Sequence, residues 1–171
     1  MNIVIACRQR TRKINPRRLK QITEALLADL EIGEAELGIN LVAAREMTLI
    51  NETFLRHEGS TDVITFDYAG ARAARPRQAK TRTRGRAARA PLHGEIFICV
   101  DESISQSKIF KTSWQSETTR YLVHGVLHLL GYDDGHPSDR RRMKRAESRL
   151  LRKLSRRFSL AQLGRAIKLA A

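Results

Sequence analysis

The segment Tyr121–Asp139, which reads YLVHGVLHLLGYDDGHPSD, constrains the fold of this chain more than any other part of it. His124 and His128 lie four residues apart within an apolar run whose spacing predicts a helix. Residues four apart share one face of a helix, so both imidazoles point into the same small volume, as they do when a helix binds a metal ion. Gly131 follows the run and suits the left-handed turn that ends a helix. We therefore predict a metal-binding helix that ends in a return turn.

The residues after this turn offer a third ligand. Asp134 and His136 are both candidates, because the turn sends the chain back across the end of its own helix. The pattern H-x-x-x-H-x-x-G-x-x-D has the spacing of a metzincin-type zinc site with Asp in place of the third His. A metalloprotease of that type needs Glu directly after its first His as the general base, and here that position is Gly125. The spacing predicts one zinc ion per chain and disfavours peptide hydrolysis.

The length and composition of the chain indicate a single intracellular domain. Its 171 residues leave room for one domain with a genuine core, and 42% of them are hydrophobic. No apolar run approaches the roughly 20 residues of a membrane span, and the N-terminal run is too short for a signal peptide. The only cysteines are Cys7 and Cys99, which favours a reducing compartment and free thiols. We expect a cytoplasmic protein.

Basic residues gather in two segments of an otherwise mildly acidic chain. Residues 69–92 contain eight Lys or Arg and no acid, and residues 140–171 contain twelve with a single acid, out of 32 basic and 18 acidic residues in all. Such segments suit a phosphate backbone, although they can also be simple solvated surface. The arginines that we expect to contact RNA are Arg82, Arg84, Arg86, Arg89, Arg141 and Arg142.

Apolar periodicity predicts an α/β (α+β) domain, with one sheet covered mainly by helices. The expected strands are residues 2–6, 36–43, 63–66 and 95–100. The expected helices are residues 16–33, 45–54 (with Met47, Ile50 and Phe54 facing inward), 101–110, 113–130, 138–154 and 159–169, the last one basic and amphipathic. Residues 69–92 lack periodicity and read as a flexible insertion between two paired strands. The domain is therefore expected over residues 1–154, with residues 155–171 as a basic extension.

Three stretches resemble the YbeY family of bacterial endoribonucleases, the rRNA maturation factors. HGVLHLLGYD at residues 124–133 is similar to that family's H-G-x-L-H-L-x-G-Y-D-H signature. Residues 49–66 and the strand Gly94–Ile98 also resemble family motifs, so that the resemblance covers residues 36–68 and 93–150. It implies a zincin-like fold with a sheet of mixed direction beside the metal-bearing helix.

The resemblance also implies an activity. Members of this family are metal-dependent, single-strand-specific endoribonucleases that act in the maturation of the 3′ end of small-subunit (16S) rRNA and in ribosome quality control. The implied partners are single-stranded RNA and the small ribosomal subunit with its proteins. The implied zinc ligands include His124 and His128, and Arg56 corresponds to the family's basic residue that faces the metal. Arg56 would hold the scissile phosphate, unless it forms a salt bridge with Glu58 or Asp62 instead.

The third ligand is the point at which this chain departs from the family pattern. The family has His where this chain has Asp134, and a histidine follows two residues later at His136. The unshifted register favours Asp134, because Met143 and Glu147 fall where the family's next helix has Met and Glu. If Asp134 and His136 both bound the ion, the site would have four protein ligands, as structural zinc sites do, in a non-catalytic RNA-binding protein.

Overall fold

The computed structural model describes residues 1–68 and 91–164. Four strands form one sheet in the order β1-β2-β4-β3, where β1 is Asn2–Cys7, β2 is Ala35–Val42, β3 is Val63–Asp67 and β4 is Leu92–Cys99. β1, β2 and β4 are parallel, whereas β3 pairs antiparallel with β4 at the edge. The expected mixed four-stranded sheet is thus confirmed. The expected insertion ends earlier than residue 92, because Leu92 already pairs with Ala35 of β2.

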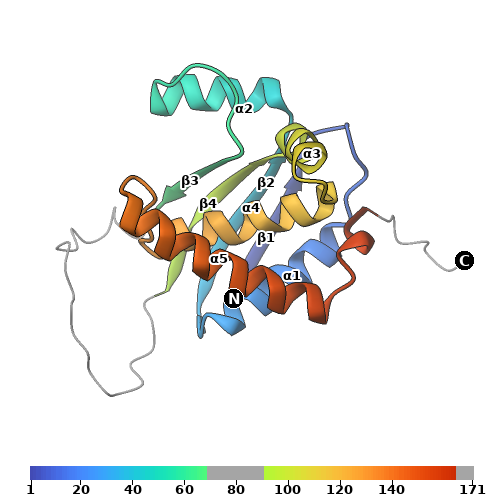
Figure 1. Ribbon diagram of the computed structural model, residues 1–171, viewed down its shortest axis with the longest axis vertical. Coiled ribbons are helices and arrows are strands. Elements are labelled where there is room, and N and C mark those ends of the chain that lie inside the picture. Colours follow the sequence, from blue (N-terminus) through green and yellow to red (C-terminus); the bar gives the residue numbers. More distant parts are fainter. Residues whose placement is uncertain (69–90, 165–171) are drawn as a thin grey trace, which may run out of the picture.

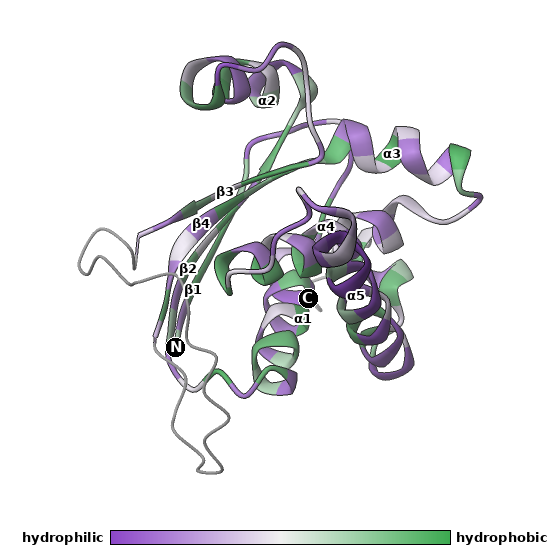
Figure 2. Cartoon of the chain, turned by 60° about the vertical axis from the view of Figure 1, so that its left-hand side comes forward, coloured by the Kyte–Doolittle hydropathy of each residue, from purple (hydrophilic) through white to green (hydrophobic). Residues whose placement is uncertain are grey.

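Three helices cover one face of this sheet: α1 (Pro16–Asp29), α4 (Trp114–Leu129) and α5 (Pro137–Arg157) (Figures 1 and 2). Two of these helices begin at side-chain caps. The side-chain oxygen of Asn15 accepts a hydrogen bond from the Arg18 N–H, with Pro16 at the first helical position, and Ser113 caps α4 in the same way. α1 ends at Asp29, four residues before the expected end.

α4 is the central helix of the domain. Leu122, Val126 and Leu127 are completely buried, and they belong to the same core as Ile96 and Ile98 of β4. This large core packs α4 between the sheet on one side and α5 on the other, so that the histidine-bearing helix rests on rigid neighbours.

A smaller cluster lies on the opposite face of the sheet, beneath α2 (Ala44–Ile50). It is built around buried Met47, with Phe97 and Cys99 of β4. The prediction that Phe54 faces inward is wrong, because its side chain is 64% exposed. The helix changes to the π-helical turn η1 (Asn51–Leu55), and this wider turn rotates the following side chains. The ring of Phe54 instead meets Phe66 edge-on, with centroids 5.3 Å apart.

The C-terminal part of the described chain packs on the main body. α5 continues to Arg157, past the expected boundary at residue 154, and the 3-10 helix η2 (Leu160–Gly164) follows. Leu163 is completely buried, and its carbonyl accepts a hydrogen bond of 2.8 Å from the Asn15 N–H. The helix expected at residues 159–169 is therefore a 3-10 turn in its described part, and residues 165–169 lie outside the described residues. Within the described ranges, no helix is both long and apolar enough to cross a membrane.

Candidate metal centre

The end of α4 fixes the turn that follows the two histidines. Gly131 has a φ of 82°, in the left-handed region that was predicted for it. The Gly131 N–H donates to the carbonyl of His128 at 2.8 Å, and the Tyr132 N–H donates to that of Leu127 at 3.0 Å. This pair of hydrogen bonds is the Schellman motif. It places the Tyr132 carbonyl beside the His128 ring.

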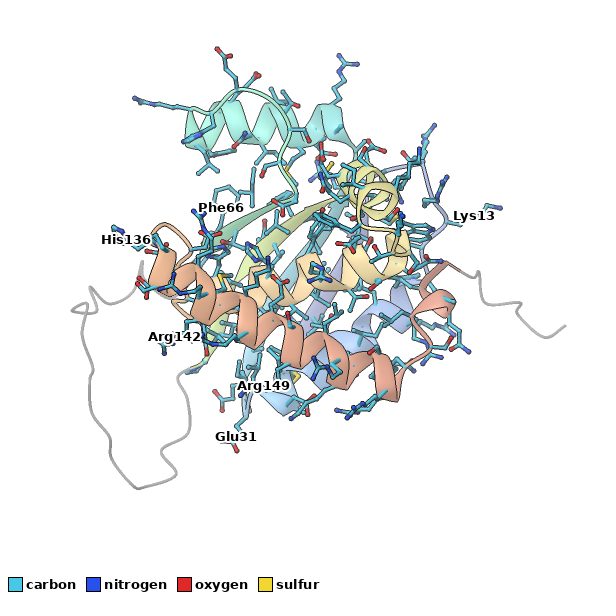
Figure 3. The ribbon with its side chains drawn as sticks, in the orientation of Figure 1. Lys13, Glu31, Phe66, His136, Arg142 and Arg149 are labelled. Carbon is cyan, nitrogen blue, oxygen red and sulfur yellow. The ribbon has the colours of Figure 1, made fainter. Side chains whose placement is uncertain are left out.

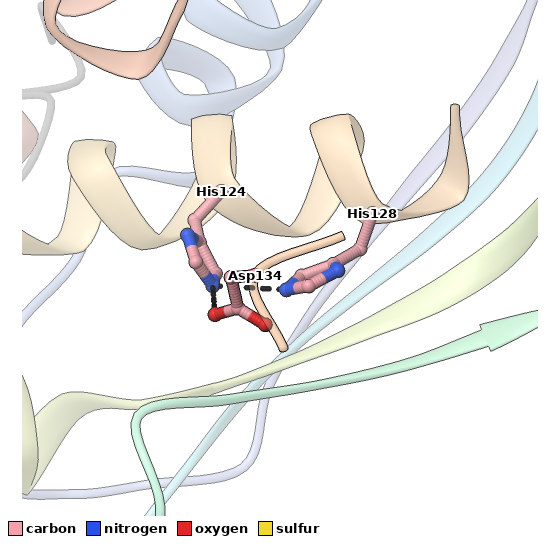
Figure 4. Close-up of side chains that lie close together, drawn as sticks. All are labelled: His124, His128 and Asp134. Carbon is pink, nitrogen blue, oxygen red and sulfur yellow. Dashed lines mark hydrogen bonds and ion pairs between the residues drawn. The ribbon is translucent and has the colours of Figure 1, made fainter. Parts of the chain in front are cut away.

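In each histidine Nδ1 has a hydrogen-bond partner, and Nε2 faces the Nε2 of the other histidine. Nδ1 of His128 lies 3.1 Å from the Tyr132 carbonyl oxygen, and Nδ1 of His124 lies 3.1 Å from Oε2 of Glu147. Both partners are acceptors, so each Nδ1 carries the proton and each Nε2 presents a lone pair. The two Nε2 atoms are 3.0 Å apart (Figure 4). Two lone pairs at this distance require a proton or a cation between them, and neutral imidazole nitrogens are good zinc ligands.

Asp134 completes a group of three potential ligands, His124, His128 and Asp134, which we call the metal group. Its Oδ2 lies 3.9 Å from Nε2 of His124, and one ligand atom from each of the three residues lies within 4.8 Å of the others. His136 takes no part in this group. It is exposed at the N-terminus of α5, and Figure 3 shows it at the edge of the molecule. The donor set of two imidazoles and one carboxylate fits zinc and leaves the fourth tetrahedral position without a ligand among the described residues.

A chain of polar contacts that the sequence did not predict supports His124. Glu147 of α5 also accepts a hydrogen bond from Arg120 at 2.9 Å, and Arg120 in turn contacts buried Glu117 at 3.2 Å. Thr112 donates to the other oxygen of Glu117 at 2.5 Å. A carboxylate on the far nitrogen of a ligating histidine fixes the ring and its tautomer. Glu147 is the carboxylate that does so here.

The charged residues that make these polar contacts shift one another's pKa values. Burial raises the pKa of Glu147, but hydrogen bonds from His124 and Arg120 outweigh burial and bring it below the ordinary value. Burial lowers the pKa of His124, but its hydrogen bond to Glu147 and the charges of Glu147, Asp62 and Asp134 raise it overall. An ionised Glu147 is thus the stable form, and it keeps a proton on Nδ1 of His124.

Gly125, the residue at the position of a peptidase's catalytic Glu, faces the sheet. A Cβ atom at Gly125 would lie 2.7 Å from Cγ2 of Ile96, closer than real Cβ contacts. α4 therefore packs directly on β4 at this point, and the sequence allows no side chain there. The structure adds a packing reason to the chemical one against a peptidase.

His124 and Asp134 of the metal group line a pocket of about 780 Å³, whose lining does not include His128. Its walls come from residues 60–62, from the C-terminal half of α3 (Val100–Ile109) and the residues after it, and from α4 and α5. Three basic side chains line it: Arg120, Arg140 and Lys144. Arg140 also donates to the backbone carbonyl of Asp134 at 3.0 Å, which ties the third ligand to α5. Five acidic residues line the pocket as well, so that the positive charge is confined to Arg120 and to the wall that α5 forms; these acidic residues are Asp62, Glu102, Glu117, Asp134 and Glu147.

Arg56 does not line this pocket. It ends the π-helical turn with a φ of 57°, an unusual value for a residue other than glycine, and its side chain is exposed. Within the part of the chain that the structure describes, it forms no ion pair with Glu58 or Asp62, the alternative considered for it. Asp62, six residues later in the same loop, does line the pocket.

The expected RNA-contacting arginines divide into two groups. Arg141 and Arg142 are exposed on α5, and the guanidinium of Arg142 lies 5.3 Å from the centre of the Tyr132 ring. Figure 3 shows Arg142 beside the N-terminal half of α5. The remaining four, Arg82, Arg84, Arg86 and Arg89, lie outside the described residues. The basic residues that line the pocket, Arg120, Arg140 and Lys144, are not among the arginines that the sequence predicted to contact RNA.

The chain is similar to one protein family over most of its length. The family model described as Endoribonuclease YbeY matches residues 4–155. Among curated relatives, all named Endoribonuclease YbeY, one from Chlorobium phaeovibrioides is 32% identical over 145 residues, which cover 83% of this chain and 84% of the relative. A solution structure from Thermotoga maritima has 19% sequence identity and a TM-score of 0.59 over 99% of both chains, which shows a common fold.

Other relatives are longer than this chain. The match to an Anaeromyxobacter protein is 33% identical over 80% of this chain but 63% of the relative, and that to a Myxococcus xanthus protein is 35% identical over 74% and 39%. The chain thus spans less than two thirds of these two proteins. The family model nevertheless matches from β1 to the end of α5, metal group included. The chain belongs to the YbeY family.

Proposed function

We propose that this protein is a zinc-dependent, single-strand-specific endoribonuclease. One observation carries the proposal: the two histidine Nε2 atoms lie 3.0 Å apart, and one of these histidines, His124, lines a pocket together with Asp134 and three basic side chains. Three protein ligands with an open fourth position are typical of catalytic zinc sites, whereas structural sites are closed. The names of the curated relatives support RNA as the substrate.

A bound divalent ion supplies Lewis-acid chemistry, which polarises a phosphate oxygen and makes water more acidic. His124, His128 and Asp134 would hold this ion. The task of the remaining residues is to bind and orient the scissile phosphodiester. Arg140 and Lys144, one helical turn apart on α5, provide positive charge on the wall of the pocket, close to Asp134.

Arg56 is proposed to stabilise the charge that grows on the phosphate. Its side chain is exposed and has no ion-pair partner among residues 1–68 and 91–164, so its guanidinium is free to bind an anion. The loop that begins at Arg56 runs directly into the pocket wall at Ser60. RNA that extends from the pocket along this loop would meet Arg56.

A cleavage assay with metal analysis tests this proposal. Wild-type protein loaded with one equivalent of Zn²⁺ should cut a labelled single-stranded RNA and leave the corresponding duplex intact. His128→Ala should lose both the bound zinc and cleavage. Arg56→Ala should keep its zinc and lose about 100-fold or more in cleavage rate, the range of a lost charge-stabilising group. Cleavage by zinc-free His128→Ala at the wild-type rate would refute metal-dependent catalysis.

Within the cell we propose that the substrate is the 3′ end of 16S rRNA, and that the protein acts in the cytoplasm on the small ribosomal subunit during maturation and quality control. The basic segment between β3 and β4 would hold the ribosomal surface. Deleting residues 70–90, which leaves Leu92 and β4 intact, should weaken RNA binding and flatten its dependence on salt. Unchanged binding would assign this segment no role in RNA recognition.

The alternative is an RNA-binding protein in which zinc is structural. It requires a fourth protein ligand, and His136 is the candidate. His136→Ala would then reduce zinc affinity as strongly as His128→Ala does, and the wild-type protein would bind RNA without cutting it.

A further inference from the structure

The pocket extends well beyond the metal group. Its lining includes Glu117, Arg120 and His124 on successive turns of α4, and from Glu117 to His124 the helix rises about 10 Å. At the Glu117 end lie Phe110 and Thr112, the latter hydrogen-bonded to Glu117. The total volume of about 780 Å³ falls within the range of roughly 300 to 1,000 Å³ that is typical of sites for whole small molecules. A single phosphate group would fill only a small part of it.

The far end has the chemistry of a nucleobase site. Phe110 lines it, although 65% of this residue is exposed, so its ring is available to a ligand. Gln106 lines the pocket one turn back along α3 from Phe110, whereas Glu102 lines it about 12 Å from Phe110 along the helix axis. An amide can hydrogen-bond to the edge of a base, while an exposed aromatic ring offers a face on which the base can stack. Figure 2 shows this end of α3 in the colour of apolar residues at the periphery of the molecule.

Two basic residues of α5 lie on one side of the pocket. Arg140 and Lys144 line it there, and Arg140 donates to the backbone carbonyl of Asp134. Phe110 lines the pocket beside α3, which contributes no basic residue to the lining. An uncharged base suits this part of the pocket better than a phosphate does, and its amino groups can donate to the amide oxygen of Gln106.

We propose that Phe110 stacks an unpaired nucleobase of an RNA strand whose phosphate lies beside His124, Asp134 and Lys144. This inference rests on the proposed function and adds to it a reason for single-strand specificity. A base that is stacked and paired in a duplex cannot insert its face against Phe110 without leaving its partner, and leaving a duplex costs free energy. Phe110 is thus a specificity-determining residue.

Ile109 provides a matched control, since it is adjacent to Phe110, 66% exposed and not part of the pocket. Single-stranded RNA containing 2-aminopurine should be titrated with full-length protein in EDTA, in which no cleavage occurs, and at a salt concentration that suppresses non-specific binding. Phe110→Ala should weaken binding about 5- to 150-fold, whereas Phe110→Tyr and Ile109→Ala should bind like wild type. The quenching of 2-aminopurine on binding should be present in wild type and Phe110→Tyr and absent in Phe110→Ala.

Three outcomes overturn the inference. Equal affinities of Phe110→Ala and wild type would exclude stacking, as would equal losses in Phe110→Ala and Ile109→Ala, or an unchanged affinity for RNA that is abasic throughout. If the zinc-loaded wild type cleaves RNA in these cases, the proposed function stands without the stacking site. A wild-type protein that neither binds nor cuts RNA would refute both.

Discussion

His128 and His124 are one helical turn apart on α4, yet different parts of the chain orient them. The Tyr132 carbonyl holds His128 through a turn that Gly131 forms, so this hydrogen bond joins residues only four apart. Glu147 of α5 holds His124, and Arg120 holds Glu147 in place. One half of the candidate metal site is therefore local and folds with its helix, whereas the other half exists only after α4 and α5 have packed together.

The largest expected effect comes from removing a ligand and is the same for both halves. His124→Ala and His128→Ala should each lower zinc affinity by more than the roughly 10- to 100-fold that is typical of losing an orienting residue. Competition titration with a chromophoric chelator measures this affinity. His136→Ala is the control and should bind zinc like wild type, because His136 lies outside the ligand group. A strong loss in the control would assign His136 as a ligand.

The long-range half of the site, which holds His124, should be disrupted by a substitution of Glu147. Glu147→Gln removes the charge that holds the Nδ1 proton of His124 while keeping the shape of the side chain, so we expect zinc affinity to fall about 10- to 100-fold. The same titration measures it, with Asp139→Asn in the first turn of α5 as a control for the loss of one carboxylate. If Glu147→Gln and Asp139→Asn lost the same zinc affinity relative to wild type, the loss of one negative charge rather than of the contact with His124 would explain the effect.

Arg120 should have a smaller effect that depends on Glu147. Arg120→Gln removes the second partner of the Glu147 carboxylate, and we expect zinc affinity to fall about 10-fold or less. In the Glu147→Gln background the same substitution should change zinc affinity little, because its effect passes through that carboxylate. Additive losses in this double-mutant cycle would show that Arg120 acts on the site by another route.

A substitution in the local half of the site, at Gly131, should have the smallest effect of this series. Gly131→Ala places a Cβ on a backbone with a φ of 82°, which should lower the free energy of unfolding by about 1 kcal/mol, although the space around it is open. Urea unfolding of the zinc-free protein measures this change. Gly33→Ala is the matched control, since Gly33 also has open space but an ordinary φ, and it should change stability by less than about 0.5 kcal/mol. Equal losses in the two variants would remove the left-handed turn as the cause.

The sequence predicted the local half of the site and missed the long-range half. Helical periodicity and the glycine turn depend on neighbouring residues, so they indicated α4, its end and the facing imidazoles. The contact between His124 and Glu147 joins residues 23 apart, and no local pattern specifies which helices pack together. One signal was available: Glu147 follows Met143 at helical spacing on the apolar face of α5, where a charged residue needs a partner.

The wrong prediction at Phe54 has a similar cause. A regular helix from Ala44 would have turned Phe54 toward the sheet, but the π-helical turn after Ile50 changes the angle at which each later side chain leaves the axis. Periodicity assumes a constant turn, so it cannot reveal where a helix widens. Arg56 and its exposed loop begin where this irregular turn ends.

The contact between Gly125 and Ile96 limits how this scaffold can be altered. A single Gly125→Glu substitution would not give the metal group the general base of a peptidase, because its Cβ would collide with β4 before the carboxylate could approach the ligands. A peptidase-type site on this scaffold would require a smaller residue at position 96 and a rotation of α4. The packing of a helix on a strand thus keeps this histidine spacing several substitutions away from the peptidase arrangement.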